Sequence, residues 1–119
     1  MGIDFTARDL QSQQKAKGLP WEIAKAFDNS AVIGEFRKLK KNEGIDFSMN
    51  LNGTEVQKGN TNDMIFSFSK IIAYASQFFT LQVGDLIYTG TPAGVGPVKI
   101  GDRLEGFLEG EKLFDFEVK

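Results

Sequence analysis

Two stretches of the chain alternate between apolar and polar residues, with a turn signal at the centre of each. In residues 47–59, FSMNLNGTEVQKG, the dipeptide Asn52-Gly53 separates two alternating runs. Asn-Gly suits a type I′ turn, because both central positions of that turn need a positive φ. A second alternating stretch runs on either side of Gly110 up to the last residue. Alternation with period two is typical of strands, so we predict one β-hairpin at Asn52-Gly53 and another around Gly110.

Helical spacing marks a different segment, residues 68–79. Apolar side chains recur there at intervals of three and four residues: Phe68, Ile71, Ile72, Ala75, Phe78 and Phe79. This spacing places them on one face of an α-helix, and Ser67 or Ser69 would cap its start. Residues 7–18 are also rich in helix formers, and we predict a second helix there with Thr6 as its N-cap.

Shorter patterns fill the remaining length. Residues 3–5 read as the end of a strand, residues 21–25 as a short helix or turn, and residues 31–34 as a strand. The segment GDLIYTG, residues 84–90, is apolar and bounded by glycines, which predicts a further strand. Residues 35–45 are charged and indicate a surface connection.

The elements add up to a mainly β fold with two or three helices. A chain of 119 residues suits one domain, so we expect a single domain over residues 1–119. Hydrophobic residues make up 41% and charged residues 25% of the chain, which is ordinary for a globular protein. No apolar run approaches the roughly 20 residues of a membrane span, so we expect no membrane association.

Charge and missing residue types narrow the chemistry. The net charge is −2 and the one basic cluster is RKLKK, residues 37–41, which predicts a solvated loop and no nucleic-acid partner. There is no cysteine, which excludes disulfides and thiol nucleophiles and favours a cytoplasmic location. There is no histidine, the usual general base near neutral pH. Any metal held by this chain must therefore be a hard ion on oxygen ligands.

The opening segment GIDFTARDLQ gathers an acid, a guanidinium and an amide. Arg8 and Gln11 are three residues apart and share a helix face, while Asp4 lies at the end of the preceding strand. Arginine binds a carboxylate through two parallel hydrogen bonds, and Asp4 is a candidate oxygen ligand for Mg²⁺ or Ca²⁺. The alternative is a plain ion pair between Asp4 and Arg8 at the strand–helix junction.

A lysine stands out in LPWEIAKAFDNS because its neighbours are apolar. Lys25 follows Ile23 and Ala24 and precedes Ala26 and Phe27. If its ammonium were buried and unpaired, it would lose its proton more readily than in water and could transfer a proton or stabilise an enolate. The alternative is a lysine that extends its ammonium into solvent.

The glycine-rich segment TGTPAGVGP, residues 89–97, is the third candidate. Its glycines, Gly90 among them, let the backbone approach a ligand closely. The hydroxyls of Thr89 and Thr91 can bind a carboxylate or phosphate oxygen. The spacing is neither that of a dinucleotide-binding loop nor that of a phosphate loop. A tight turn between strands explains the segment equally well.

Four segments together resemble the fumarylacetoacetate hydrolase family. They are GIDFTARDLQ, KGLPWEIAKAFDNS, GNTNDMIF and TGTPAGVGPVKIGD, and their order and spacing fit the C-terminal part of the family's catalytic domain. The resemblance covers essentially the whole chain. It is closest to the acylpyruvate hydrolase, oxaloacetate decarboxylase and homoprotocatechuate-pathway isomerase/decarboxylase members.

The resemblance implies a fold and a set of roles. The fold would be the family's mixed β-roll, incomplete here at its N-terminus. Asp4 matches a ligand of Mg²⁺ or Mn²⁺ (Ca²⁺ being a substitute in a crystal), and Lys25 matches the active-site lysine. Substrate-binding positions match at Arg8, Gln11 and the turn of Gly90 and Thr91. The implied activity is metal-dependent hydrolysis, decarboxylation or isomerisation of 2-oxo or 1,3-dioxo acids in catabolism, by a homodimer or higher homo-oligomer.

One departure from the family pattern opens a second possibility. The family's Glu-x-Glu metal ligands and its lid His–Glu pair normally precede the strand of Asp4, and this sequence shows neither. Metal binding by this chain alone is therefore expected to be weak and its turnover no more than trace. The alternative to an enzyme is a non-catalytic, truncated β domain that folds or oligomerises.

Overall fold

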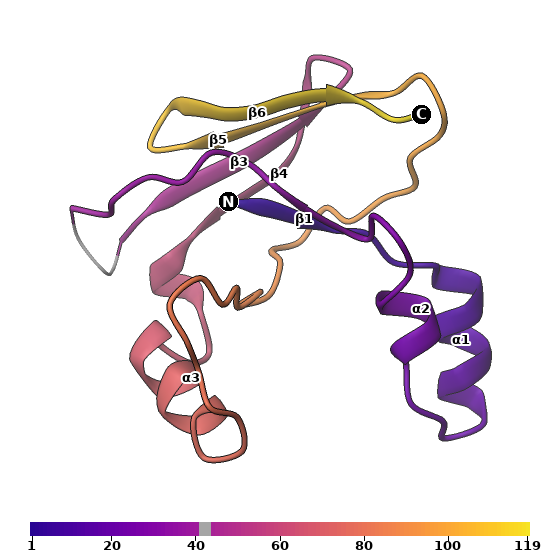
Figure 1. Cartoon of the computed structure of the whole chain (residues 1–119). Coiled ribbons are helices and arrows are strands. Elements are labelled where there is room, and N and C mark those ends of the chain that lie inside the picture. Colours follow the sequence, from indigo (N-terminus) through magenta and orange to yellow (C-terminus); the bar gives the residue numbers. More distant parts are fainter. Residues whose placement is uncertain (41–43) are drawn as a thin grey trace.

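Two antiparallel sheets form the framework of the chain. A computed structural model describes residues 1–40 and 44–119. The larger sheet has the strand order β4-β3-β5-β6, with β3 at Asp46–Leu51, β4 at Thr54–Asn60, β5 at Arg103–Leu108 and β6 at Glu111–Glu117. The smaller sheet pairs β1 (Gly2–Asp4) with β2 (Ala31–Ile33) and lies against the larger one (Figure 1). The expected mainly β fold with helices is confirmed.

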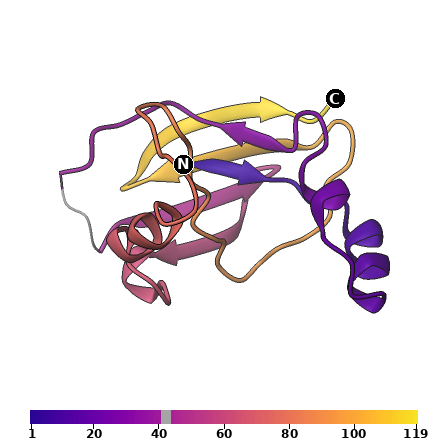
Figure 2. The ribbon, with the colours of Figure 1, turned by 60° about the horizontal axis from the view of Figure 1, so that its bottom comes forward.

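Within the described residues, three α-helices and one short 3-10 helix accompany the sheets. The helix α1 (Arg8–Ala16) and the short α2 (Glu22–Lys25) follow β1, and α3 (Phe68–Ala75) follows the 3-10 helix η1 (Thr61–Asp63). The pair α1–α2 and the helix α3 project from opposite ends of the sheet, as the two views agree (Figures 1 and 2). Residues 76–102 then return to the sheet without regular secondary structure.

Both predicted hairpins are confirmed, because their turns are specified locally. Asn52 and Gly53 have φ of 51° and 80° between β3 and β4. Glu109 and Gly110 have φ of 51° and 79° between β5 and β6. Positive φ at both central positions is the geometry of a type I′ turn. The two hairpins join edge to edge through β3 and β5, which are antiparallel neighbours.

The small core lies on the apolar face of the larger sheet. Leu104, 1% exposed, is paired with Leu51 on one side and with Phe116 on the other. Gly106 accommodates the ring of Phe114, since a Cβ at this glycine would lie 2.2 Å from the ring. The two sheets connect where the backbone N–H of Glu35 donates to the carbonyl of Leu113 at 3.0 Å.

A buried carboxylate fastens the first hairpin to the start of β5. The Oδ1 atom of Asp102 accepts a hydrogen bond from Asn52 Nδ2 at 2.9 Å, and its Oδ2 accepts one from the backbone of Lys99 at 2.9 Å. These bonds, that from Asn52 first, hold the pKa of Asp102 below its usual value. Arg103 in turn donates its backbone N–H to Asn52 Oδ1 at 2.8 Å.

Two predictions of secondary structure are wrong. Residues 84–90 form no strand, because their backbone makes no ladder of hydrogen bonds with any described strand. Thr6 does not cap α1: the N-cap position is Ala7, and the Thr6 hydroxyl binds partners described below. By contrast, Ser67 does cap α3, accepting a hydrogen bond from the backbone of Lys70.

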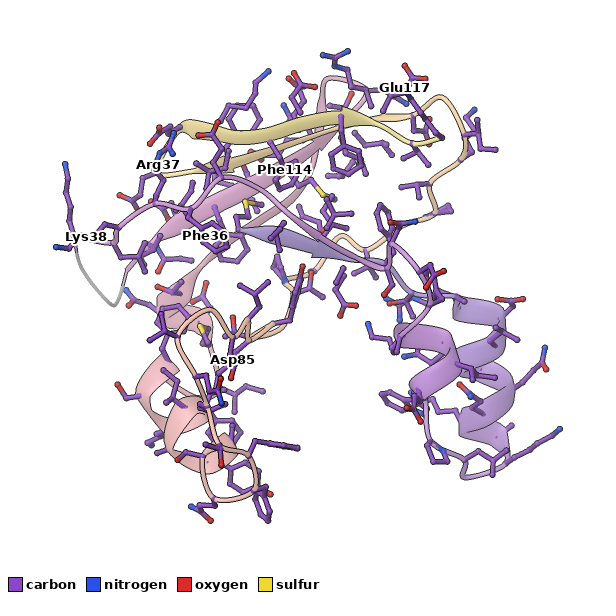
Figure 3. The ribbon with its side chains drawn as sticks, in the orientation of Figure 1. Phe36, Arg37, Lys38, Asp85, Phe114 and Glu117 are labelled. Atoms are coloured by element: carbon purple, nitrogen blue, oxygen red, sulfur yellow. The ribbon has the colours of Figure 1, made fainter. Side chains whose placement is uncertain are left out.

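The charged connection after β2 is exposed, as expected for a surface segment. Arg37 pairs with Glu35 at 2.6 Å and with Glu111 of β6 at 2.9 Å. Lys38 extends away from the rest of the molecule (Figure 3). Part of the predicted connection, and the last residue of the basic cluster, lie outside the described residues.

Candidate active site at the junction of β1, α1 and α2

Two backbone hydrogen bonds bring α2 to the end of β1. The N–H of Phe5 donates to the carbonyl of Ser30 at 2.8 Å, and the N–H of Ala7 donates to that of Ala24 at 3.0 Å. Ala24 is fully buried between the two segments. Lys25, the next residue, is thereby placed beside the side chains at the end of β1.

The ammonium of Lys25 makes the central contact of this junction. Its Nζ lies 2.6 Å from Asp4 Oδ2 and donates to Thr6 Oγ1 at 2.8 Å. The Lys25 side chain is 33% exposed and that of Asp4 is 44% exposed. An ammonium has three donors, and the third has no partner among the described residues. Lys25 is therefore paired and only partly buried.

Arg8 and Gln11 form a second polar pair one turn into α1. Arg8 Nη1 donates to Gln11 Oε1 at 3.0 Å, which confirms that the two side chains share a helix face. The expected alternative, an ion pair between Asp4 and Arg8, is wrong: the cationic partner of Asp4 in the described chain is Lys25. The guanidinium of Arg8 therefore has no carboxylate partner among the described residues, and it is exposed.

The glycine-rich segment is anchored elsewhere, on β4. Gln57 Nε2 donates to Thr91 Oγ1 at 2.9 Å and to the carbonyl of Pro92 at 3.1 Å. Gly90 has a φ of 115°, a conformation that favours glycine. Within the described residues, no hydrogen bond or ion pair joins Thr91 to Asp4 or Lys25. Their meeting around a shared ligand stays a prediction.

One side chain near the junction was not identified from the sequence. The Tyr88 hydroxyl donates to the carbonyl of Val32 in β2 at 2.9 Å and so ties the 84–90 segment to the small sheet. Burial, and then the negative charge of Asp4, raise the pKa of Tyr88. In the sequence, Tyr88 follows Leu86 and Ile87 and gave no signal beyond a predicted strand.

The described residues do not form a complete metal site. They contain no group of three or more His, Cys, Asp or Glu side chains able to hold an ion. Asp4 offers one carboxylate, already bound to an ammonium. Mg²⁺ and Mn²⁺ are bound through several oxygen ligands, so this donor set alone does not fit the ion that the family resemblance implies.

A hollow of about 480 Å³ lies beside the junction, between its Thr6 side and the end of β6. Its walls are mainly apolar, with Phe5, Phe27 and Phe116 among the lining residues. The volume suits a small molecule, but neither Asp4 nor Lys25 lines it.

No described helix has the length and apolar character needed to cross a lipid bilayer.

Comparisons with known proteins identify what the chain resembles. Residues 1–116 match the family model described as fumarylacetoacetate (FAA) hydrolase C-terminal. The chain is 44% identical over 117 residues to the oxaloacetate tautomerase of Escherichia coli, covering 95% of this chain and 53% of that protein. It is 43% identical over 120 residues to the mitochondrial oxaloacetate tautomerase of Mus musculus, covering 98% and 54%. The chain thus spans about half the length of the curated relatives it matches.

A solved structure shows the same fold. It is the fumarylpyruvate hydrolase of Pseudomonas aeruginosa, in complex with Mn²⁺ and pyruvate. The TM-score is 0.85 at 39% identity, and the match covers 99% of this chain and 51% of the other.

Proposed function

Because the chain belongs to the fumarylacetoacetate hydrolase family, we propose that it carries one half of an active site for small 2-oxo acids. The reaction we propose is the keto–enol tautomerisation of an oxaloacetate-type acid. The observation that carries the proposal is the position of the Lys25 ammonium, whose Nζ lies 2.6 Å from Asp4 Oδ2 and 2.8 Å from Thr6 Oγ1 at the junction of β1 and α1. Relatives with 42–44% identity are named oxaloacetate tautomerases.

Tautomerisation moves one proton from C3 of the oxo acid and delivers one to the oxygen on C2, with no change in the carbon skeleton. Negative charge develops on that oxygen in between. Lys25 has an N–H that no described residue accepts, and this donor would stabilise the charge where it develops. Two anchored hydrogen bonds fix its direction before substrate arrives, so no reorganisation is needed.

The remaining residues would orient the acid. Arg8 presents an exposed guanidinium, which matches a carboxylate through two parallel hydrogen bonds. Gln11 holds that guanidinium at 3.0 Å and would add an amide contact. The turn of Gly90 and Thr91 would bind the carboxylate from the sheet side.

Asp4 would contribute one carboxylate to a divalent ion, which when bound supplies Lewis-acid polarisation of the oxo group. The described residues do not complete its ligand set, so no step is derived through the ion. The Mn²⁺ and pyruvate in the Pseudomonas aeruginosa relative support divalent-metal use within the family. A choice of Mg²⁺, and a cytoplasmic location, stay predictions.

The second candidate is a non-catalytic β domain that folds or oligomerises. The incomplete metal site among the described residues favours it. On either reading, the 119-residue chain by itself is expected to turn over oxaloacetate no faster than a trace.

The test is a chimera in which this sequence replaces the matched segment of the Escherichia coli tautomerase. The disappearance of enol-oxaloacetate is followed by ultraviolet absorbance with Mg²⁺ or Mn²⁺ present. We expect a rate within about tenfold of the parent enzyme, because a site with the same groups keeps most of its transition-state stabilisation. A folded chimera without turnover would favour the non-catalytic reading.

A further inference from the structure

One glutamine side chain of β4 holds the turn of Gly90 and Thr91. Gln57 Nε2 donates to Thr91 Oγ1 at 2.9 Å and to the carbonyl oxygen of Pro92 at 3.1 Å. A carbonyl oxygen only accepts hydrogen bonds, so the amide atom of Gln57 that faces it must be the nitrogen. The Thr91 oxygen contacts the same nitrogen and therefore accepts its hydrogen bond from Gln57.

The Thr91 hydroxyl is left with its own proton to donate. A hydroxyl carries one donor besides its acceptor lone pairs, and no described residue accepts the proton of Thr91. Thr91 is exposed, so a ligand can reach it. An ionised carboxylate only accepts hydrogen bonds, and it binds such a donor strongly.

A β-bulge in β4 lies where the glycine-rich segment meets the sheet. The register shifts after Met49, the partner of Gln57, and leaves Val56 as an extra residue in β4. The carbonyl oxygen of Val56 approaches Gly94 so closely that it leaves no room for a Cβ there. Bulges re-aim side chains and are frequent next to active sites. The bulge thus accounts for a Gln57 side chain directed at the turn.

The start of the turn is held on the face of β1 that carries Asp4. The Tyr88 hydroxyl donates to the carbonyl of Val32 at 2.9 Å, and a Cβ at Gly2 would lie 2.9 Å from the same hydroxyl. Residues two apart in a strand share a face, so Tyr88 lies on the side of β1 to which Gly2 and Asp4 point. Thr91 follows within a chain span of at most about 11 Å. These anchors support a place for its hydroxyl on the Asp4 side of the molecule.

We propose that Gln57 is a positioning residue for the carboxylate of the oxo acid: its amide fixes the Thr91 oxygen as an acceptor, so that the hydroxyl proton is directed to a carboxylate oxygen of the ligand. This inference rests on the proposed function, because it assigns a role within the same site. A hydroxyl that is ordered in advance spares the ligand the cost of ordering it. The role of Gln57 is in binding, whereas Lys25 acts on the developing charge.

Two substitutions of Gln57 test the direction of this hydrogen bond in the chimera with the Escherichia coli tautomerase. Gln57→Glu has nearly the same shape, but its ionised carboxylate only accepts and so takes the Thr91 proton that the ligand needs. Gln57→Met keeps an unbranched stem and has no amide. Calorimetric titration with oxalate, a diacid that cannot tautomerise, measures the affinity in the presence of Mg²⁺. We expect Gln57→Glu to weaken oxalate binding at least about tenfold, the scale of a hydrogen bond to a charged group.

Turnover of enol-oxaloacetate separates binding from catalysis in the same variants. An interaction that is equally strong in the bound substrate and in the transition state changes KM and leaves kcat unchanged. We expect the KM of Gln57→Glu to rise at least about tenfold with kcat within about threefold. Thr91→Val removes the hydroxyl and should raise KM to a similar extent, whereas Thr91→Ser keeps the hydroxyl and should stay within about threefold.

A double substitution separates positioning from a merely structural role. If Gln57 acts through the Thr91 hydroxyl, Gln57→Met should weaken oxalate binding less than about twofold once Thr91→Val is present. If Gln57 only fastens the turn through Pro92, the loss is the same in both backgrounds, and that result would overturn the proposal.

The unsubstituted chimera allows a measurement that depends on no Gln57 variant. Oxalate should shift the NMR resonances of the Gln57 side-chain amide, because a hydroxyl that donates to a carboxylate becomes a stronger acceptor. Gln13 is the internal reference: it is an exposed glutamine of α1, about 200° around the helix from Gln11. Its amide resonances should stay in place, and Gln13→Glu should change the affinity for oxalate less than about twofold.

Failure of this inference and failure of the proposed function give different results. A chimera that binds oxalate through Gln57 but does not turn over enol-oxaloacetate would refute the proposed reaction and leave the inference standing. An active chimera whose oxalate affinity is the same in both Gln57 variants, or whose Gln57 amide does not shift, would overturn the inference alone. A folded chimera that neither binds oxalate nor shows turnover would overturn both.

Discussion

Replacing Lys25 by Met should leave the stability of the chain almost unchanged. Met keeps the unbranched apolar stem but removes the ammonium that contacts Asp4 and Thr6. If the ion pair is a functional arrangement, its loss should matter far more for chemistry than for folding. If it is a structural fastening, the fold should weaken.

The expected magnitude follows from distance and exposure. Opposite unit charges 2.6 Å apart attract by roughly 1.6 kcal/mol in water. Both side chains are about one-third exposed or more, and measured exposed pairs contribute about 0.2–1 kcal/mol after screening and side-chain entropy. We therefore expect Lys25→Met to lower the free energy of unfolding by less than about 1 kcal/mol. Breaking a buried pair would cost about 3–5 kcal/mol.

Urea denaturation of the 119-residue chain measures this difference. Trp21, the one tryptophan of the chain, precedes α2 directly and reports on the same region by its fluorescence. Lys38→Met is the matched control, because Lys38 extends into solvent (Figure 3). A loss above about 3 kcal/mol in Lys25→Met, with the control unchanged, would refute the reasoning and make the pair a structural one.

Three further substitutions test the framework around the site. Leu104→Ala should lower the free energy of unfolding by about 2–5 kcal/mol in urea titrations, because it opens a cavity in the small core, and a loss below about 1 kcal/mol would contradict the assigned core. Asp102→Asn should destabilise the chain at neutral pH, because the pKa of Asp102 is lower in the folded chain than in the unfolded chain. The carboxylate therefore stabilises the fold above the unfolded pKa of about 3.9, and this contribution is lost as the pH falls through the folded pKa. Thermal unfolding at pH 7 and pH 3 checks this, and an equal effect at both values would contradict the charge-based account. Gly94→Ala should release the glycine-rich turn from β4, since its Cβ would lie 2.0 Å from the carbonyl oxygen of Val56 at a φ of 97°; amide exchange in β4 that stays unchanged would disprove this.

Local chemistry made the hairpins and α3 predictable. The turns at Asn52-Gly53 and before Gly110 need positive φ whatever surrounds them, and Ser67 caps α3 through a bond three residues away. Such features are specified within a few residues, so the sequence pattern suffices. The strand predicted over residues 84–90 failed for the opposite reason. A strand needs a ladder of backbone hydrogen bonds with another strand, and no described strand forms one with that segment.

The site was predictable as a set of residues and not as a set of contacts. Asp4 and Lys25 followed from the family resemblance, but their direct pairing joins residues 21 positions apart. Proximity in sequence favoured Arg8 as the partner of Asp4. The backbone hydrogen bond from Ala7 to Ala24 instead brings Lys25, the residue after Ala24, beside Asp4. In the same junction the Thr6 hydroxyl accepts a hydrogen bond from Lys25 and does not cap α1. Both contacts join residues far apart in the sequence, so the pattern of neighbouring residues does not predict them.

The central claim is that the ammonium of Lys25 acts on the oxo acid. The most direct test compares the rates of enol-oxaloacetate decay in the single-chain chimera with Lys25→Met and with Lys38→Met. The account predicts that Lys25→Met lowers kcat by about a hundredfold or more, the scale of losing one donor to a developing oxyanion, while Lys38→Met stays within about twofold of the chimera. Undiminished turnover in folded Lys25→Met would contradict the account.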